Sequence, residues 1–324
     1  MPRQITAFSN PLVKQVRGLR DKKGRRETGL FMAEGLRILT EARDSGFLPK
    51  LLFYNGAEPP HRLLGELIDM VEGAGDEAIE TNADILHKLS GKDNPQIVLG
   101  VFEAFPTDLE SLDRSKADLW IVAQALRDPG NLGTILRTGD AVGAGGLILV
   151  DECVDPFSVE AVRASMGALF TQRIAAAPWE AFVAWLRSGP GELIGTSLKA
   201  TQDYQEPRYT KPAFILVGNE AQGLPEAYEA ECDTLVKIPM GGRADSLNAA
   251  VAMRWVNRAP IVARTASTEK GSTQSSTRMR PPAPTASPVR RIVPRLPGSR
   301  SAWATIHKGA ALRSIRSSEV SNWR

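Results

Sequence analysis

The sequence predicts an α/β protein with two consecutive α/β units and a C-terminal segment that lacks a core. In the second unit, mostly apolar strand patterns alternate with helix patterns, which implies a parallel sheet covered on both faces. The first unit shows the same alternation over a shorter stretch. The final residues are instead rich in proline, serine, threonine and arginine. We therefore expect one unit at 1–106, a linker at 107–117, a larger unit at 118–257 and a disordered tail at 258–324.

The chain begins with a predicted helix and a charged loop. Ser9 or Asn10 is placed to cap a helix that has Pro11 in its first turn. Apolar residues then recur at helical spacing, namely Leu12, Val13, Val16 and Leu19. The highly charged residues 21–27 favour a loop over a helix.

Residues 31–106 alternate helix and strand patterns, as expected of a small α/β layer unit. The predicted elements are a helix at 34–45 ended by Gly46, a strand at 50–54, a helix with an apolar face of Leu63, Leu64, Leu67, Ile68 and Val71, a helix from Asn82 to Leu89, and a strand at 97–104. The polar residues that follow are typical of a linker.

The larger unit contains the apolar strands that predict the parallel sheet. They lie at 119–123, 147–150, 193–196, 213–217 and 234–238. A glycine-containing stretch at 143–146 lacks the third glycine of a dinucleotide-binding fingerprint and precedes a strand instead of opening a helix. A nicotinamide-dependent dehydrogenase is therefore not supported.

The positive charge of the chain is concentrated in the tail. Residues 258–324 hold 13 Lys/Arg and 2 Asp/Glu, whereas residues 1–257 hold 27 Lys/Arg and 35 Asp/Glu. The sequence pI of about 8.9 is therefore no evidence for a basic, nucleic-acid-binding body. Contact between the basic tail and RNA remains an alternative to simple disorder.

Composition excludes several other classes of protein. No apolar stretch approaches the roughly 18 residues that a membrane span needs, and the N-terminus lacks a secretory apolar core, so we expect a cytoplasmic protein without membrane contact. Cys153 and Cys232 are expected to be free thiols. His61, His87 and His307 have no metal-ligand spacing, so no metal site is predicted.

Three short segments carry the residues best suited to chemistry, at 128–139, 215–225 and 237–251. A glycine at the end of a strand, such as Gly218, either forms a plain tight turn or lets a ligand approach the backbone. Arg137, about two helical turns into its segment, either lies in solvent or holds a charged group with its fork of donors. Ser246 and Asn248, at a predicted helix start, suit capping.

In this order, the three segments resemble the three motifs of the SpoU (TrmH-like) family of RNA ribose 2′-O-methyltransferases, in the SPOUT superfamily. The resemblance implies S-adenosylmethionine as methyl donor and no metal. The cofactor-binding positions it implies are Thr196, Gly218, Asn219, Ile238, Met240 and Leu247. The catalytic positions it implies are Asn131, Arg137, Glu220, Ser246 and Asn248. Because arginine stays protonated at almost any pH, we expect Arg137 to orient the ribose and stabilise a developing alkoxide. Glu220 alone could equally be a surface carboxylate.

The N-terminal unit is similar to the substrate-binding region of rRNA and tRNA enzymes of this family. Residues 31–105 would correspond to a domain similar to ribosomal protein L30e. Four basic residues just before it either contact RNA phosphates or form a solvated charged segment, namely Lys22, Lys23, Arg25 and Arg26.

The resemblance also implies the fold and the partners. It implies a deep trefoil knot in the larger unit, which periodicity cannot reveal, and a homodimer. It favours structured RNA as substrate, with rRNA first and tRNA next. The alternative is an RNA-binding protein that has lost catalysis, because the last apolar helix stops at 256.

Overall fold

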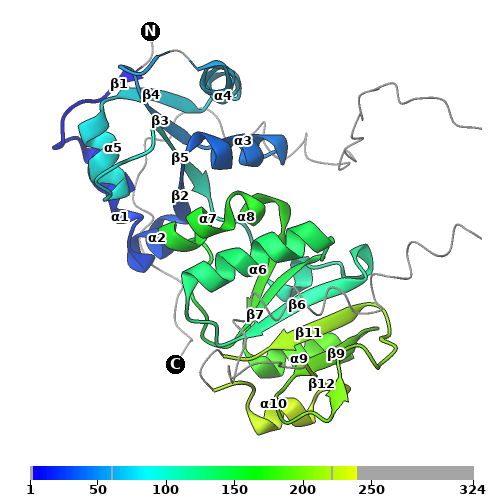
Figure 1. Cartoon of the computed structure of the whole chain (residues 1–324). Coiled ribbons are helices and arrows are strands. Elements are labelled where there is room, and N and C mark those ends of the chain that lie inside the picture. The colour runs from blue at the N-terminus through cyan, green and yellow to red at the C-terminus, as the bar shows by residue number, and fades with distance from the viewer. Residues whose placement is uncertain (1–2, 60, 220–221, 239–324) are drawn as a thin grey trace, which may run out of the picture. The chain divides into compact units, whose positions relative to one another are not determined.

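The computed structural model describes residues 3–59, 61–219 and 222–238, all within one compact unit at 1–271. This part of the chain contains two β-sheets, each covered by helices (Figure 1). The predicted disordered tail at 258–324 lies outside the described residues.

The first sheet is mixed and lies between two helix layers. Its strand order is β1 (Arg3–Gln4), β4 (Glu77–Thr81), β3 (Leu51–Asn55), β5 (Val98–Glu103) and β2 (Leu30–Glu34). The helices are α1 (Pro11–Gly18), α2 (Lys22–Thr28), α3 (Leu36–Asp44), α4 (Arg62–Gly73) and α5 (Ala83–Ser90). Alternate strand residues point to opposite faces: Phe53 packs with α1 and α5, whereas Leu52 and Tyr54 pack with α3 and α4.

Local signals located most of these elements correctly. Asn10 caps α1 by accepting a hydrogen bond from the Leu12 backbone N–H at 2.9 Å. Asn82 caps α5 in the same way, by accepting from Ile85 N–H at 2.9 Å. Two predictions were wrong. Residues 22–28 form α2 instead of a loop, and Glu34 belongs to β2, so α3 starts at Leu36.

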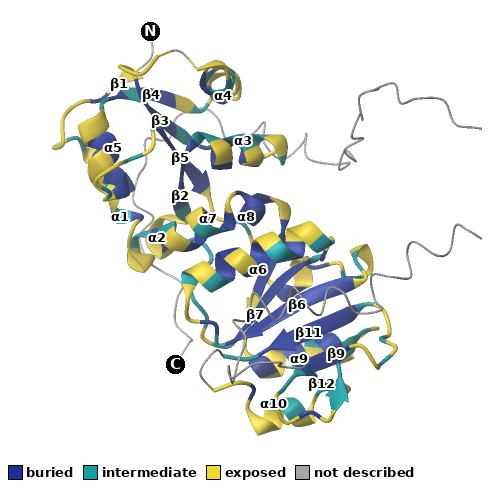
Figure 2. Ribbon diagram, viewed as in Figure 1, coloured by how far each residue is buried: buried dark blue, intermediate teal, exposed yellow. Residues whose placement is uncertain are grey.

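The second sheet is parallel throughout its described strands, as predicted. Its strand order is β10 (Gln202–Asp203), β12 (Thr234–Lys237), β9 (Glu192–Thr196), β11 (Ala213–Val217), β6 (Leu119–Gln124), β7 (Gly146–Val150) and β8 (Arg173–Ala177). The helices α6 (Pro129–Val142), α7 (Val159–Ser165) and α8 (Ala168–Thr171) cover one face, and α9 (Trp179–Arg187) and α10 (Glu226–Ala230) lie at the other. Burial on both faces leaves the central strands without exposed residues (Figure 2). The sequence did not predict β1, β2, β4, β8 or β10.

The segment between the two sheets is packed instead of loose. It contains two short 3-10 helices, Leu109–Ser111 and Arg114–Lys116. Leu109 and Leu112 are buried against the second sheet. Arg114 donates hydrogen bonds to the carbonyls of Trp185 and Leu186, the latter at 2.9 Å, so this segment is fixed to α9.

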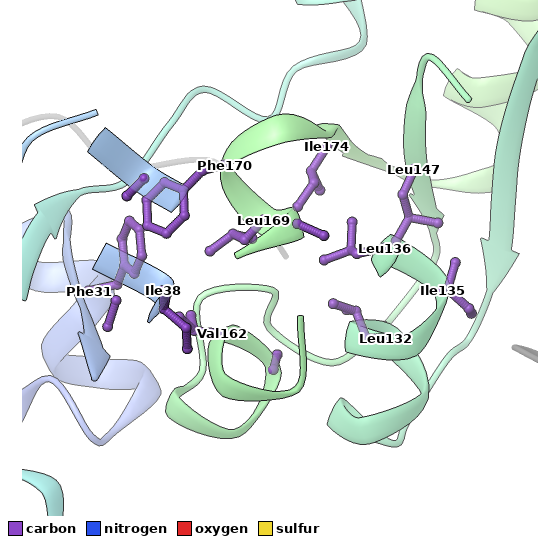
Figure 3. Close-up of a cluster of buried hydrophobic side chains, with 14 of the residues drawn as sticks. Phe31, Ile38, Leu132, Ile135, Leu136, Leu147, Val162, Leu169, Phe170 and Ile174 are labelled. Atoms are coloured by element: carbon purple, nitrogen blue, oxygen red, sulfur yellow. The ribbon is translucent and has the colours of Figure 1, made fainter. Parts of the chain in front are cut away.

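An aromatic cluster joins the first sheet to helices of the second, and Figure 3 shows two of its rings, Phe31 of β2 and Phe170 of α8. Phe31 of β2 lies 5.0 Å from Phe157 and 6.1 Å from Phe170 between ring centroids. Phe102 of β5 also packs on Phe170, with 4.9 Å between the centroids. Both sheets therefore share one buried apolar core.

A buried ion pair lies beside this cluster. The Arg25 guanidinium is 2.8 Å from an Asp155 carboxylate oxygen, and the two side chains are 7% and 16% exposed. Arg25 also donates to the carbonyls of Leu19 and Arg20, both at 2.8 Å. Asp155, in the loop between β7 and α7, thus fixes α2, which explains why these charged residues form an ordered helix.

Replacing Arg25 with alanine should lower the free energy of unfolding by about 3 kcal/mol, because Asp155 would keep a buried charge without its partner. Urea denaturation followed by circular dichroism would measure this loss. Lys23→Ala is the matched control on the same helix, since its pair with Glu27 is exposed and should contribute under about 0.5 kcal/mol. Equal stability of the two variants would contradict a structural role for Arg25.

Candidate functional site

The carboxyl ends of four neighbouring parallel strands form the candidate site. Strands β12, β9, β11 and β6 are adjacent in the second sheet. Ligands of α/β proteins bind beyond the carboxyl ends of such strands. Thr196 ends β9, Gly218 follows β11 and Ile238 follows β12, so the structure brings these three predicted positions to one edge of the sheet.

The loop after β11 folds back tightly on itself. The Gly223 N–H donates to the Asn219 carbonyl at 2.9 Å, and Gly223 has a φ of +69°. A Cβ atom at Gly218 would lie 2.4 Å from the carbonyl carbon of Gly223 and 2.6 Å from Leu224 N. Only glycine fits at 218 without moving the loop.

A hydrogen bond connects this loop to the segment after β6. The Asn219 side-chain amide donates to the Ala125 carbonyl at 2.9 Å. Ala125 has a φ of +48°, an unusual backbone conformation for a non-glycine residue. The second sequence segment is thus held against the loop after β6, about ninety residues earlier, which leads into the first segment at Asp128.

A cavity of about 360 Å³ lies between the loops that follow β6 and β11. Its lining residues are Gln124, Ala125, Arg127, Asn219, Gln222, Gly223, Leu224 and Pro225. The volume is within the range of small-molecule sites. Residues of two loops line it, several of them with polar side chains, which suits a ligand held by hydrogen bonds from these loops.

Residues at the neighbouring strand ends are themselves held in place. The Thr196 hydroxyl donates to the Leu216 carbonyl at 3.0 Å, across from β9 to β11. Ser197 donates its backbone N–H to the Val236 carbonyl at 2.9 Å. Ile238 is half-buried against the apolar core. The other predicted cofactor-binding positions, Met240 and Leu247, lie outside the described residues.

Helix α6 carries the predicted catalytic residues of the first segment. Asp128 caps it by accepting a hydrogen bond from the Asn131 N–H at 2.6 Å, and Pro129 is its first residue. Gly133 lets α6 approach α7 closely, because a Cβ atom there would lie 2.4 Å from the Ala164 Cβ. Arg137 is exposed and pairs with none of the described carboxylates. The predicted catalytic positions Glu220, Ser246 and Asn248 lie outside the described residues.

A polar network that the sequence did not predict supports the cavity wall. Asp151, just after β7, accepts hydrogen bonds from Gln124 Nε2 at 3.3 Å, Tyr228 Oη at 2.9 Å and Trp179 N–H at 3.0 Å. The Tyr228 ring stacks on Trp179 with 3.9 Å between centroids. Desolvation, followed by the bond to Asp151, raises the pKa of Tyr228 to about 12, so the phenol remains a donor at neutral pH. The signal in the sequence that could have revealed this network was an aspartate directly after an apolar strand.

The four predicted RNA-contacting residues of α2 divide into two groups. Lys22, Lys23 and Arg26 are exposed. Arg25 is buried and its guanidinium is engaged by Asp155 and two carbonyls, so its side chain does not lie on an RNA-accessible surface. That expectation is corrected for Arg25, because tertiary packing turned this one charge inward.

Other expectations concern cysteines, metals and membranes. Cys153 and Cys232 are free, as predicted, and burial raises the pKa of the Cys232 thiol to about 12. Within the described ranges, no group of three or more His, Cys, Asp or Glu side chains could hold a metal ion. No helix in the same part of the chain is long and apolar enough to cross a membrane.

Comparison with known proteins places this geometry in a family. The model of the SpoU rRNA methylase family matches residues 118–256, and that of the MRM3-like substrate-binding domain matches residues 10–100. The 23S rRNA (uridine(2479)-2'-O)-methyltransferase of Streptomyces viridochromogenes is 33% identical over 72% of this chain and 82% of its own length. The chain belongs to the SpoU rRNA methylase family. The resemblance seen in the three motifs is thereby confirmed.

Solved structures of SpoU-type proteins share the fold. An AdoMet-bound rRNA methyltransferase from Sinorhizobium meliloti is 39% identical, with a TM-score of 0.73 over 79% of this chain and 95% of its own. The SpoU methyltransferase AviRb from Streptomyces viridochromogenes, in complex with AdoMet, is 29% identical with a TM-score of 0.72 over 80% of this chain and 99% of its own.

A second relative compared by sequence is the 23S rRNA (guanosine(2553)-2'-O)-methyltransferase of Bacillus subtilis. It is 30% identical over 77% of this chain and 96% of its own length.

Proposed function

We propose that this SpoU family member transfers a methyl group from S-adenosylmethionine to a ribose 2′-hydroxyl of ribosomal RNA. The observation that carries the proposal is the hydrogen bond from Asn219 to Ala125, which joins the second family motif to the loop that leads into the first motif, around one cavity. The relatives named 23S rRNA 2'-O-methyltransferases favour rRNA, with tRNA the nearest alternative substrate. No observation favours the alternative of a protein that has lost catalysis.

The described residues fit the cofactor. A Cβ atom at Gly218 would collide with the backbone of Gly223, so glycine keeps this loop tightly folded beside a cavity that residues of two loops line. Thr196, Gly218, Asn219 and Ile238 would hold it from three strand ends, together with Met240 and Leu247. When bound, S-adenosylmethionine supplies an electrophilic methyl group on a sulfonium.

The chain's own residues would position the ribose. Holding the 2′-oxygen in line with the methyl carbon contributes much of the rate of such a displacement. Arg137 would orient the ribose and stabilise the negative charge that develops as the hydroxyl proton leaves. Asn131, Glu220, Ser246 and Asn248 would hold Arg137 and the ribose in this arrangement.

The proposal extends to domains and assembly. Residues 1–106 would form an L30e-like substrate-binding domain, joined through 107–117 to a SPOUT domain at 118–257 that ends in a trefoil knot, with a disordered basic tail at 258–324. The exposed residues Lys22, Lys23 and Arg26 would add phosphate contacts. The protein would act as a homodimer in the cytoplasm.

Incubating the purified protein with S-adenosylmethionine labelled in its methyl group and with unmodified total RNA tests the activity. We expect label in the large rRNA band after separation by size. Label in the tRNA band would change the substrate class. Absence of label from every RNA, with a folded protein that binds the cofactor, would contradict the proposed activity.

A further inference from the structure

A basic cleft lies away from the cofactor site, where the first sheet's helices meet α7. It has a volume of about 560 Å³. Helix α1 and the turn after it contribute Lys14, Arg17 and Arg20, the turn after α5 contributes Lys92, and α7 contributes Arg163. Helices α1 and α5 lie side by side (Figure 1). The cleft is therefore lined by both parts of the chain that the two family models match.

Most of the cations in this cleft are unneutralised. Lys14, Arg17, Arg20 and Arg163 form no ion pair with any carboxylate that the structure describes. Lys92 pairs with the buried Glu34 carboxylate. Two further lining residues are acidic, Asp21 and Glu160. Four unpaired cations in one cleft are notable because residues 1–257 carry more acidic than basic side chains.

The cleft is built around a glycine with a left-handed backbone. Gly91 ends α5 with a φ of +70°. A Cβ atom at this position would lie 2.3 Å from the Arg20 guanidinium carbon. Because glycine has no side chain, the Arg20 guanidinium can lie directly against the Gly91 backbone. The His87 ring nitrogen Nδ1 is 2.5 Å from the Lys92 carbonyl oxygen, which fixes the turn that carries Lys92.

The chemistry of the cleft suits a chain of phosphates. Arginine binds phosphate oxygens with two parallel donors, and lysine binds them as a point charge. The cleft holds more cations, on three elements, than one phosphate needs. Few apolar side chains line the cleft, which disfavours an apolar ligand. A polyanion that crosses the cleft would contact several of these side chains in turn.

We propose that this cleft binds the phosphodiester backbone of the substrate RNA and sets the position of the RNA relative to the methyl-transfer site. This inference rests on the proposed function, since it assigns a docking surface to the same substrate. The cleft differs from the other basic region of the first unit, helix α2. In α2, Arg25 is buried and Lys23 forms an ion pair with Glu27. The cleft instead presents cations without a described ion-pair partner from α1 on one side and α7 on the other.

The test is the double variant Arg17→Gln, Arg163→Gln, which removes one cation from each side of the cleft. Both side chains are exposed, so the fold should be retained, and a melting curve checks this. The control is Arg62→Gln, Lys116→Gln, which removes the same charge from side chains that are 85% and 78% exposed outside the cleft. Unmodified 23S rRNA made by transcription is the probe, and filter binding at several salt concentrations gives the affinity.

We expect the cleft variant to bind the RNA about tenfold more weakly at low salt, and the slope of log K against log salt to fall by about 1.5. Its KM for RNA should rise, with S-adenosylmethionine affinity unchanged. Affinity equal to the control's would overturn the cleft proposal, as would a wild-type protein that does not bind the RNA. A second pair, Lys14→Gln with Arg17→Gln, repeats the test on α1 alone.

The outcomes separate this inference from the proposed function. Wild-type methyl transfer with no effect of the cleft variant would leave the activity standing and reject the cleft. Weaker binding by the cleft variant, in a protein that never methylates RNA, would support the cleft and reject the activity.

Discussion

Replacing Arg137 with alanine is expected to lower kcat for methyl transfer by roughly 10²–10³-fold, which is typical for loss of one donor to a developing oxyanion. The side chain is exposed on α6 and pairs with no described carboxylate, so its charge is available for the ribose. The affinity for S-adenosylmethionine should stay within a few fold, because the described cofactor positions lie on other loops.

Single-turnover methylation with saturating RNA, alongside calorimetric cofactor binding, would measure both effects. Arg62→Ala is the matched control, since Arg62 is also an exposed helical arginine but lies on α4 of the first sheet. A kcat for Arg137→Ala equal to that of the control would remove Arg137 from the mechanism. A large loss of cofactor affinity instead would assign Arg137 to binding.

Replacing Gly218 with alanine should weaken S-adenosylmethionine binding by about 10- to 100-fold. The new Cβ atom would lie 2.4 Å from the Gly223 carbonyl carbon, so the loop must move away from the position that encloses the cavity. Forcing one methyl group into a packed site costs about 1–3 kcal/mol, and each 1.36 kcal/mol corresponds to a factor of ten. Methyl transfer at limiting cofactor should fall in parallel.

Gly65→Ala is the control for the glycine substitution. Gly65 lies within α4, where an added Cβ atom meets nothing within 4 Å, so alanine should be neutral or slightly stabilising there. Isothermal titration with S-adenosylmethionine and thermal unfolding would compare the two variants. If Gly218→Ala binds the cofactor as tightly as Gly65→Ala does, this loop has no part in the cofactor site.

Features that depend on neighbouring residues could be predicted from the amino-acid sequence alone. Asn10 and Asn82 cap their helices because a cap needs only residues two or three positions away. The continuous apolar strands predicted the parallel sheet because burial on both faces excludes polar alternation. The three motifs identified the family, and the ends of strands β9, β11 and β12 bring Thr196, Gly218 and Ile238 to one edge.

Contacts between residues that are distant in the sequence became visible only in the folded protein. Arg25 looked like part of an exposed basic run, yet Asp155, 130 residues later, turns it inward and orders α2. Asp151 supports the cavity wall because Gln124 and Tyr228, from two other elements, donate hydrogen bonds to its carboxylate. The basic cleft likewise forms because Arg17 of α1 and Arg163 of α7 line the same cavity. Such contacts depend on strand order and helix packing, and no local pattern of charge or hydrophobicity encodes them.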